Sequence, residues 1–471
     1  MDRNKGQQKY RAMRFWMLLS LLYLAFGPAF AQQDKKTDDL KPADPDTGES
    51  TVEERTLGLL PNPLEKHGIK FAITYIGEIL GNPTGGAKQG SVYEDRINFA
   101  VDADLDKLMN LKQVSFHANA FQIDGGGLTR GALLNFMDVS GIEAQPTTRL
   151  YEIWFEKKWG DKVALRAGQL AADTEFINSK YTDVFTNASL GWPAGVSLNL
   201  PSGGPSPPLA VMGARLRADV TDNLTLIGAV FDGNAAGPGP GDPQLRDRYG
   251  VNFRVNDPPL VLTEAQFQWH SKKGDPGLAG KFKLGGWHHF GSFADEQLDT
   301  SGLSLANPAS NGVPAALAQD DGVYAVFEQK LLRVGKDDDR GIGVFARGSY
   351  SPPDRNLIDA YVDGGIELVG LTDRRPHDKF GVALAYAHLS PRAQALDRDF
   401  QSIYGPAWPL RSSETVVTAV YQYEVQAGLT LQPNVQYIRH PGGGATDPLT
   451  PGRGRHLGDA TVLGLRTVVK F

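Results

Sequence analysis

The chain has 471 residues with 54 glycines, 30 prolines and no cysteine, and it carries 48 basic and 54 acidic residues. The lack of cysteine excludes a disulfide framework, a thiol nucleophile and any cysteine-ligated metal site. The formal net charge of −6 does not favour a nucleic-acid partner.

The first 31 residues have the order of a secretory signal. Arg11 and Arg14 precede the apolar run FWMLLSLLYLAF, and small residues follow up to Ala31, after which we expect cleavage. The run is shorter than the about 20 apolar residues of a membrane-spanning helix. Removing five basic and one acidic residue with residues 1–31 leaves 43 against 53, a formal charge of −10. Residues 32–56 are charged and contain proline, so we expect a flexible segment.

From Ile69 onward, apolar and polar residues alternate in segments of about ten residues, the length of a tilted strand that spans a bilayer. In RINFAVDADL, apolar residues occupy every second position from Ile97 to Leu105. No helical period competes with this alternation. The pattern predicts an all-β fold, an antiparallel transmembrane β-barrel over residues 57–471. Sixteen strands are expected near residues 70–80, 95–105, 112–123, 147–158, 162–170, 209–220, 224–232, 260–270, 280–290, 322–331, 341–350, 358–369, 379–390, 413–425, 429–440 and 460–471.

A further alternating stretch, RYGVNFRV at 248–255, is cut off from the next strand by DPP. We expect it to extend the eighth strand, because single-chain bacterial barrels have an even number of strands, with short periplasmic turns and longer outer loops. Sixteen strands place WGDK, TDN and QAG at one end, with SPPDRN as a short exception at the other. The long connections are expected at residues 124–146, 171–208, 291–321, 391–412 and 441–459.

The connection 171–208 is the longest, and loops of this length usually have a function or are disordered. Its aromatic content favours packing inside the barrel lumen over packing against neighbouring loops at the mouth. The inward-loop candidates are Asp173, Glu175, Tyr181, Phe185 and Trp192.

The last expected strand reads VLGLRTVVKF. Side chains alternate between the faces of a strand, so Leu465 and Phe471 share an apolar face while Arg466 and Lys470 lie on the other. A lipid-facing Phe471 would place an aromatic ring at the periplasmic membrane interface, where such rings concentrate. A carboxy-terminal phenylalanine on an alternating strand also resembles the assembly signal of outer-membrane barrels. We therefore expect the barrel-assembly machinery to be a partner.

Four separated stretches together resemble the OprB-type carbohydrate-selective porins of Gram-negative outer membranes, from about Leu60 to Phe471. This resemblance implies a sixteen-stranded outer-membrane barrel through which small sugars such as glucose diffuse, with sugars and outer-membrane lipids as partners. The segment 32–56 matches no family motif, and the preferred sugar and the homo-oligomeric state stay open. The four stretches are PLEKHGIKFAITYIGEILGNPTGG, YEIWFEKKWGDKVALRAGQLAADTEF, LAGKFKLGGWHHFG, and LQPNVQYIRHPGG followed by the final LGLRTVVKF.

A sugar path needs hydrogen-bond donors and acceptors beside apolar faces, and selectivity follows from the pore width and the groups that line it. Glu152, Trp154 and Arg166 would offer an acceptor, a stacking face and a donor to one sugar. The alternative is that Trp154 packs beneath an inward loop and that the charged side chains only solvate the lumen. By strand parity the candidate lumen residues are Glu78, Arg96, Asn98, Glu152, Trp154, Glu156, Arg166, Arg215, Arg217, Gln266 and Gln268.

The sequence favours a channel over an enzyme. The pair HH at 288–289 lacks a metal-ligand spacing, the glycines at 237–243 precede no phosphate-binding helix, and no GxSxG motif occurs. We expect no catalytic residue, metal or cofactor. Two other functions remain open: a general or anion-preferring small-solute porin, and a non-conducting surface or structural barrel. The mixture of Glu and Arg on the expected inner face argues against a phosphate-type channel.

Overall fold

The computed structural model describes residues 55–272, 274–335, 337–449 and 455–471. The expected signal, its cleavage after Ala31 and nearly all of the charged segment 32–56 lie outside these residues. Within the described ranges, no helix is both long enough and apolar enough to cross a membrane.

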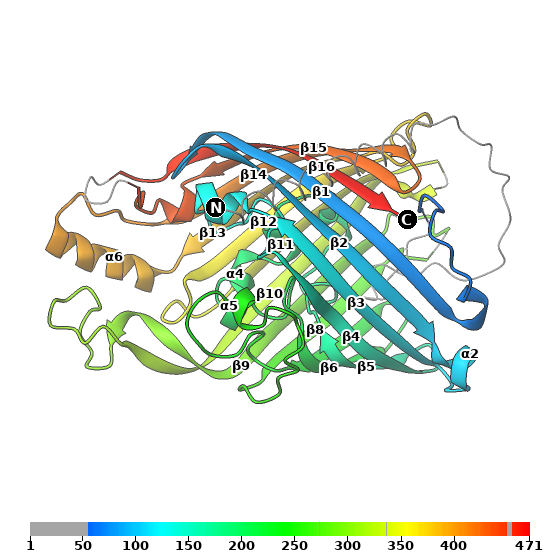
Figure 1. Cartoon of the computed structure of the whole chain (residues 1–471), viewed down its shortest axis with the longest axis horizontal. Coiled ribbons are helices and arrows are strands. Elements are labelled where there is room, and N and C mark those ends of the chain that lie inside the picture. Colours follow the sequence, from blue (N-terminus) through cyan, green and yellow to red (C-terminus); the bar gives the residue numbers. More distant parts are fainter. Residues whose placement is uncertain (1–54, 273, 336, 450–454) are drawn as a thin grey trace, which may run out of the picture. The chain divides into compact units, whose positions relative to one another are not determined.

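Sixteen antiparallel strands close into a barrel in which sequence neighbours pair and β1 pairs with β16 (Figure 1). The alternation of the sequence gives the wall its two faces: Ile79 is 58% exposed, whereas Glu78 and Leu80 on either side are 0% exposed. The predicted sixteen-stranded antiparallel barrel is confirmed. Its strands are β1 (Ile69–Gly86), β2 (Gly90–Asp104), β3 (Val114–Gly125), β4 (Thr147–Trp159), β5 (Val163–Leu170), β6 (Val211–Asp219), β7 (Leu224–Phe231), β8 (Leu260–Trp269), β9 (Gly280–Asp299), β10 (Pro314–Val334), β11 (Asp337–Tyr350), β12 (Ile358–Val369), β13 (Lys379–Leu389), β14 (Ser413–Gln426), β15 (Leu429–Arg439) and β16 (Gly458–Lys470).

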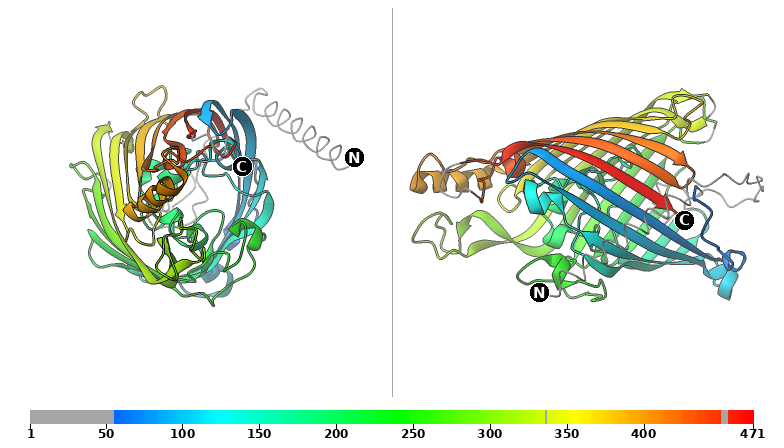
Figure 2. Two further views of the ribbon diagram at one scale, coloured as in Figure 1. Left: turned by 90° about the vertical axis from the view of Figure 1, so that its left-hand side faces the viewer. Right: turned by 45° about the horizontal axis from the view of Figure 1, so that its top comes forward.

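The predicted short turns lie at one end of the barrel, and most of the long connections lie at the other. Two connections at the long-loop end are shorter than predicted, because the strands on either side of them extend further than expected. β1 and β2 meet at residues 87–89, where the Asn82 side chain accepts the Gly90 N–H at 3.0 Å. β9 and β10 project beyond the wall as a long hairpin (Figure 2, right), so most of the expected loop 291–321 is strand.

The connection 391–412 contains a helix that the alternation did not predict, α6 (Pro391–Tyr404). Its start has a local cause, since the Ser390 hydroxyl accepts the Ala393 N–H at 3.2 Å and Pro391 occupies the first turn. The remaining described helices and helical turns are η2 (Glu65–His67), α2 (Leu105–Met109), η3 (Thr129–Leu133), η4 (Lys180–Thr182), α3 (Ala188–Gly191), α4 (Ala194–Ser197), η5 (Pro201–Gly203), α5 (Pro243–Arg246) and η6 (Pro441–Gly443).

The predicted extension of the eighth strand by residues 248–255 is wrong. These residues form no strand, and β8 begins only at Leu260. Pro258 and Pro259 stand between them and β8, and because proline has no N–H to donate, the ladder is interrupted there.

β4 contains an irregularity that changes the predicted faces. The pairing of β4 with β3 shifts between Asn119 and Ala120, and this shift places Tyr151 inside the barrel rather than on the lipid face. The Tyr151 ring stacks on Phe121 with ring centroids 4.4 Å apart. Glu152 nevertheless points inward, where it accepts the Ala171 N–H at 3.0 Å.

Candidate functional site

The connection 171–210 between β5 and β6 lies inside the ring of strands (Figure 2, left). It is folded locally into capped turns: the Asn187 side chain, for example, accepts the Ser189 N–H. At its base the Ala172 N–H donates to the Pro205 carbonyl at 2.6 Å, which closes the loop on itself. The loop therefore enters the lumen as a compact unit.

Two glycines of the wall make room for the aromatic rings of this loop. A Cβ atom at Gly343 on β11 would lie 2.0 Å from the Tyr181 ring, and one at Gly381 on β13 would lie 2.8 Å from the Phe185 ring. Both rings are buried against the inner wall. The inward-loop candidates Tyr181 and Phe185 thus pack against strands, and Phe185 also borders the 420 Å³ cavity described below.

A buried ion pair on the wall forms hydrogen bonds with the backbone of the loop. Arg347 on β11 and Asp363 on β12 are 2.6 Å apart, with side chains 1% and 0% exposed. A guanidinium has five N–H donors in a fixed arrangement, and those of Arg347 also reach the loop. The carbonyls that accept them belong to Ile177, Ser189, Leu190 and Gly191.

Three acidic side chains of the inner wall accept backbone N–H groups from the loops. Glu264 lies on β8, Glu328 on β10 and Glu414 on β14, and all three are buried. Such contacts satisfy loop donors that have no strand partner. Glu264 accepts from Ile177 at 3.1 Å, Glu328 from Lys180 at 2.9 Å, and Glu414 from Phe136 and Met137 in the neighbouring inward loop at 2.8 Å each.

Four of the predicted residues form one buried charge cluster. Glu156 on β4 contacts Arg166 on β5 at 3.0 Å and Arg215 on β6 at 2.9 Å. Glu175 from the inward loop contacts the same two arginines at 3.0 and 2.5 Å. Two cations and two anions compensate one another, which buried charges require. The cluster borders a cavity of about 180 Å³ that the β4–β5 turn also lines.

Both faces of the Trp154 ring are covered. The Arg166 guanidinium lies 3.8 Å from the centroid on one side, and the His117 ring stacks with its centroid 5.0 Å away. Trp154 is also buried. A sugar could stack on this ring only after Arg166 moved, so the geometry gives Trp154 the role of a support for the charge cluster.

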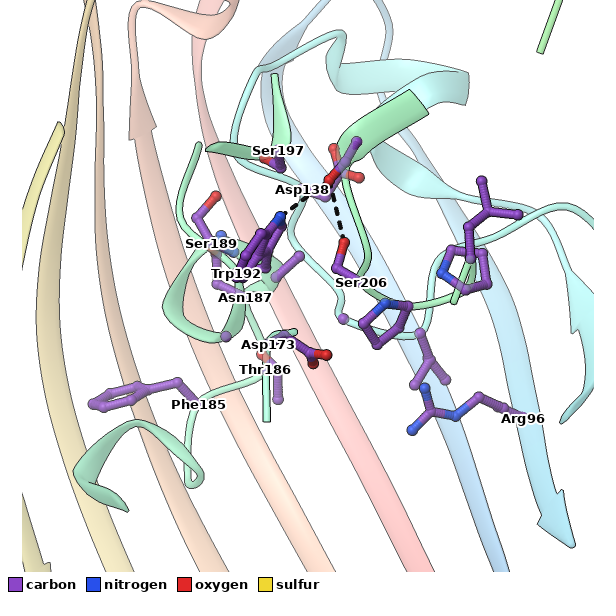
Figure 3. Close-up of a pocket in the computed structure, with 18 of the residues that line it drawn as sticks. Arg96, Asp138, Asp173, Phe185, Thr186, Asn187, Ser189, Trp192, Ser197 and Ser206 are labelled. Carbon is purple, nitrogen blue, oxygen red and sulfur yellow. Dashed lines mark hydrogen bonds between the residues drawn. The ribbon is translucent and has the colours of Figure 1, made fainter. Parts of the chain in front are cut away.

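A larger cavity of about 420 Å³ lies between the inward loops and the wall strands β1, β2 and β16 (Figure 3). Arg96 and Arg466 reach it from the wall, and Asp138 and Asp173 reach it from the loops. The Trp192 ring lies on its border and donates its indole N–H to the Gly203 carbonyl at 3.0 Å. Donors, acceptors and an aromatic ring therefore meet around one space of the size typical of small-ligand pockets.

Burial raises the pKa values of two acidic side chains in this cavity. Burial, with the neighbouring Glu152 charge, raises the pKa of the loop residue Asp173 to about 7. Burial likewise raises the pKa of Asp138, and the nearby carboxylates of Glu143 and Glu414 add to the effect. Protonation of these carboxylates removes negative charge, so the cavity is more positive below neutral pH than above it.

Cation preference of the channel should therefore rise as the pH passes upward through about 7, because Asp173 becomes a carboxylate there. Reversal potentials in a salt gradient, measured on both sides of neutrality, report this change. Asp173→Asn should lose most of the change near pH 7 and keep the low-pH selectivity. An unaltered pH curve in this variant would assign the titration to other groups.

Other predicted residues lie apart from the 420 Å³ cavity, and one of them, Arg217, borders the 180 Å³ cavity beside the charge cluster. Asn98 accepts from the Asn119 side chain at 3.1 Å, and Arg217 pairs with Asp219 near the short-turn end at 3.2 Å. Gln266 donates to Glu264 at 2.6 Å. Gln268 donates to the Asp222 carbonyl in a short turn. Glu78, in contrast, bonds Arg466 at the edge of the 420 Å³ cavity.

The sequence did not identify several residues that line this cavity. Arg466 stood on the polar face of the last strand, so strand parity could have found it. Asp138, Asn187, Ser189 and Gln244 lie in loops, and their position depends on long-range contacts that no local pattern reports.

A closed sixteen-stranded barrel with an apolar outer face, short turns at one end and loops folded into a polar lumen is an outer-membrane porin. A family model described as "Carbohydrate-selective porin, OprB family" matches residues 88–471, and the chain belongs to this family of outer-membrane channels.

Known proteins agree with this assignment. The chain is 23% identical to Porin B of Pseudomonas aeruginosa over 411 residues, 81% of this chain and 84% of that protein. It is 22% identical to the putative porin QuiX of Acinetobacter baylyi, over 87% of this chain and 90% of that one. The high-pH structure of Pseudomonas putida OprB superposes with a TM-score of 0.74 at 22% identity, covering 87% of this chain and 96% of that chain. The last likeness shows the shared fold.

Proposed function

We propose that small carbohydrates of monosaccharide size, such as glucose, cross the barrel through the 420 Å³ cavity. The observation that supports this path is the convergence of Arg96 and Arg466 from the wall with Asp173 and Trp192 from the loop around one space. Sugar hydroxyls can accept from the arginines and donate to the carboxylate, while the C–H face of the ring meets the apolar border. The charge cluster of Glu156, Arg166, Arg215 and Glu175 forms the next polar surface toward the short-turn end.

Each contact along the path should be weak, because conduction requires binding that lets the sugar both enter and leave. A single hydrogen bond contributes roughly 0.5 to 1.5 kcal/mol net, so losing one should change sugar occupancy about two- to tenfold. The sugar stays mobile because several such contacts share its hydroxyls in turn.

Arg96→Ala should weaken glucose-induced current block several-fold and leave conductance in salt alone unchanged or raised, because a donor and its bulk leave the cavity. Block is measured in planar bilayers with and without glucose. Arg340→Ala is the matched control, since Arg340 lines neither the 420 Å³ nor the 180 Å³ cavity and pairs with the exposed Asp373. Equal block in both variants would move the sugar path away from Arg96.

We also propose that residues 1–31 are removed on export and that Phe471 acts in barrel assembly. The Phe471 N–H donates to the Ile73 carbonyl at 3.0 Å, so the last residue joins β16 to β1 at the closure of the barrel. Phe471→Asp should lower the folded yield in heat-modifiable gel mobility, because charge on the lipid side is penalised. Lys470→Ala, on the neighbouring inward position, should fold like the parent. Equal yields for the two variants would contradict the lipid-side position of Phe471.

A further inference from the structure

Residues 248–255, the stretch RYGVNFRV, run from the edge of β4 across the ends of β5 and β6; we name them the outer segment. The Tyr249 carbonyl accepts the Leu150 N–H at 3.0 Å, and the Gly250 carbonyl accepts from the Gln169 side chain at 3.0 Å. Gln169 is in register with Ile153 on β4 and with Met212 on β6.

That register places Gln169 on the outward face of the wall. The outward face can be followed along β4 to Phe155 and along β6 to Leu216, both of which are exposed. Gln169 itself is buried, because the outer segment covers it. A small cavity is bordered by Gln169 and Met212 of the wall and by Phe253 and Arg254 of the outer segment, so the outer segment continues across the end of β6.

The wall beneath the outer segment is short. β5, β6 and β7 have 8, 9 and 8 residues, whereas β4 has 13 and β9 has 20. Eight residues at about 3.3 Å each, tilted by roughly 40°, rise about 20 Å, which is less than the apolar band of about 25 Å on an outer-membrane barrel. Three adjacent strands therefore end before the band does.

The outer segment supplies apolar surface at this place. Tyr249, Val251, Phe253 and Val255 alternate along it and are 60%, 51%, 45% and 71% exposed. The backbone of residues 249–251, where the outer segment meets the wall, finds its partners within the protein, as contact with lipid requires. Besides the two carbonyls already named, the N–H groups of Gly250 and Val251 bond the buried Asp247 side chain.

We propose that the outer segment completes the lipid-facing wall above β5, β6 and β7, with its alternate side chains in the outer leaflet of the membrane. The occupant is lipid rather than a second copy of the chain because the segment continues the lipid face of the strands below it, from Leu216 and Val230, at the height where those strands stop. This inference is independent of the sugar path.

The chain has no cysteine, so single-cysteine variants can be labelled without background. The Val251→Cys variant is labelled with a fluorophore and reconstituted into liposomes that contain brominated phospholipids, whose bromine atoms quench a fluorophore that lies in the lipid. Leu216→Cys, on the wall of β6, is the lipid-facing control, and Tyr404→Cys, an exposed position of α6, is the water-facing control. Quenching at position 251 should be comparable with that at 216 and several-fold stronger than that at 404.

Two outcomes would overturn the proposal. Quenching at 251 no stronger than at 404, with fast labelling by a charged water-soluble reagent, would place the segment in water. A bifunctional thiol reagent that joins copies of Val251→Cys, while Leu216→Cys stays uncross-linked, would make the segment a contact between copies. Cysteine is a small apolar residue, and the folded fraction of each variant is checked by heat-modifiable mobility before labelling.

Discussion

Replacing Arg347 with alanine should detach the inward loop 171–210 from the wall and destabilise the folded barrel by about 3 to 5 kcal/mol, the cost of leaving one partner of a buried ion pair uncompensated. Asp363 would lose the guanidinium of Arg347 as its partner, and four loop carbonyls would lose their donor. The midpoint of the heat-induced mobility shift measures the stability, and current noise in single-channel recordings measures the loosened loop.

Arg340→Ala on the same strand is the matched control. Arg340 pairs with Asp373, whose side chain is 93% exposed, and exposed pairs contribute about 0 to 1 kcal/mol. A small shift is therefore expected for Arg340→Ala and a large one for Arg347→Ala. Midpoints that fall equally in both variants, with quiet single-channel currents, would show that the loop is held by other contacts.

Deleting residues 180–204 should raise single-channel conductance and admit larger oligosaccharides. The deleted part supplies the loop side of the cavity, including Asn187, Ser189 and Trp192, whereas the bond between Ala172 and Pro205 keeps the base of the loop closed. The barrel should still fold, because loop-closure entropy changes slowly with length. Liposome-swelling rates across sugars of graded size measure the widened path.

Removing α6, residues 391–404, is the control for this deletion. The helix lies beyond the wall and does not line the cavity (Figure 1), so its removal should leave conductance and the sugar size limit as in the parent. Conductance that stays at the parent level after deletion of 180–204 would mean that the narrowest part of the path is built by the wall alone.

Local alternation predicted the strands well because the two faces of a barrel wall meet different solvents, and a period of two is visible within ten residues. Alternation failed where one residue shifted the register: at β4, Tyr151 turned inward although its neighbours in sequence suggested the lipid face. The start of α6 could have been predicted from Ser390 and Pro391, which form a local helix signal independent of hydrophobic period.

The contacts that shape the lumen could not be predicted in this way. Arg347 and Asp363 can be recognised as inward residues from the alternation. The hydrogen bond from Arg347 to the Ser189 carbonyl depends on a loop that crosses the lumen from β5. Likewise, the alternation in 248–255 predicted an extension of the eighth strand, and the structure forms no strand there. What these residues contact depends on how far β5, β6 and β7 extend. These long-range contacts are set by the strand register and the strand lengths together.

The wall holds its inward loops by their main chains. Arg347 donates to carbonyls, and Glu264, Glu328 and Glu414 accept peptide N–H groups, so these grips do not depend on which side chains the loops carry. The anchoring contacts and the proposed sugar-contacting surface can therefore vary separately, because loop side chains can be exchanged while the anchors stay in place. The same separation makes the barrel a frame for grafting, in which the side chains at cavity positions such as Ser197 and Leu198 are exchanged and the anchoring contacts are kept.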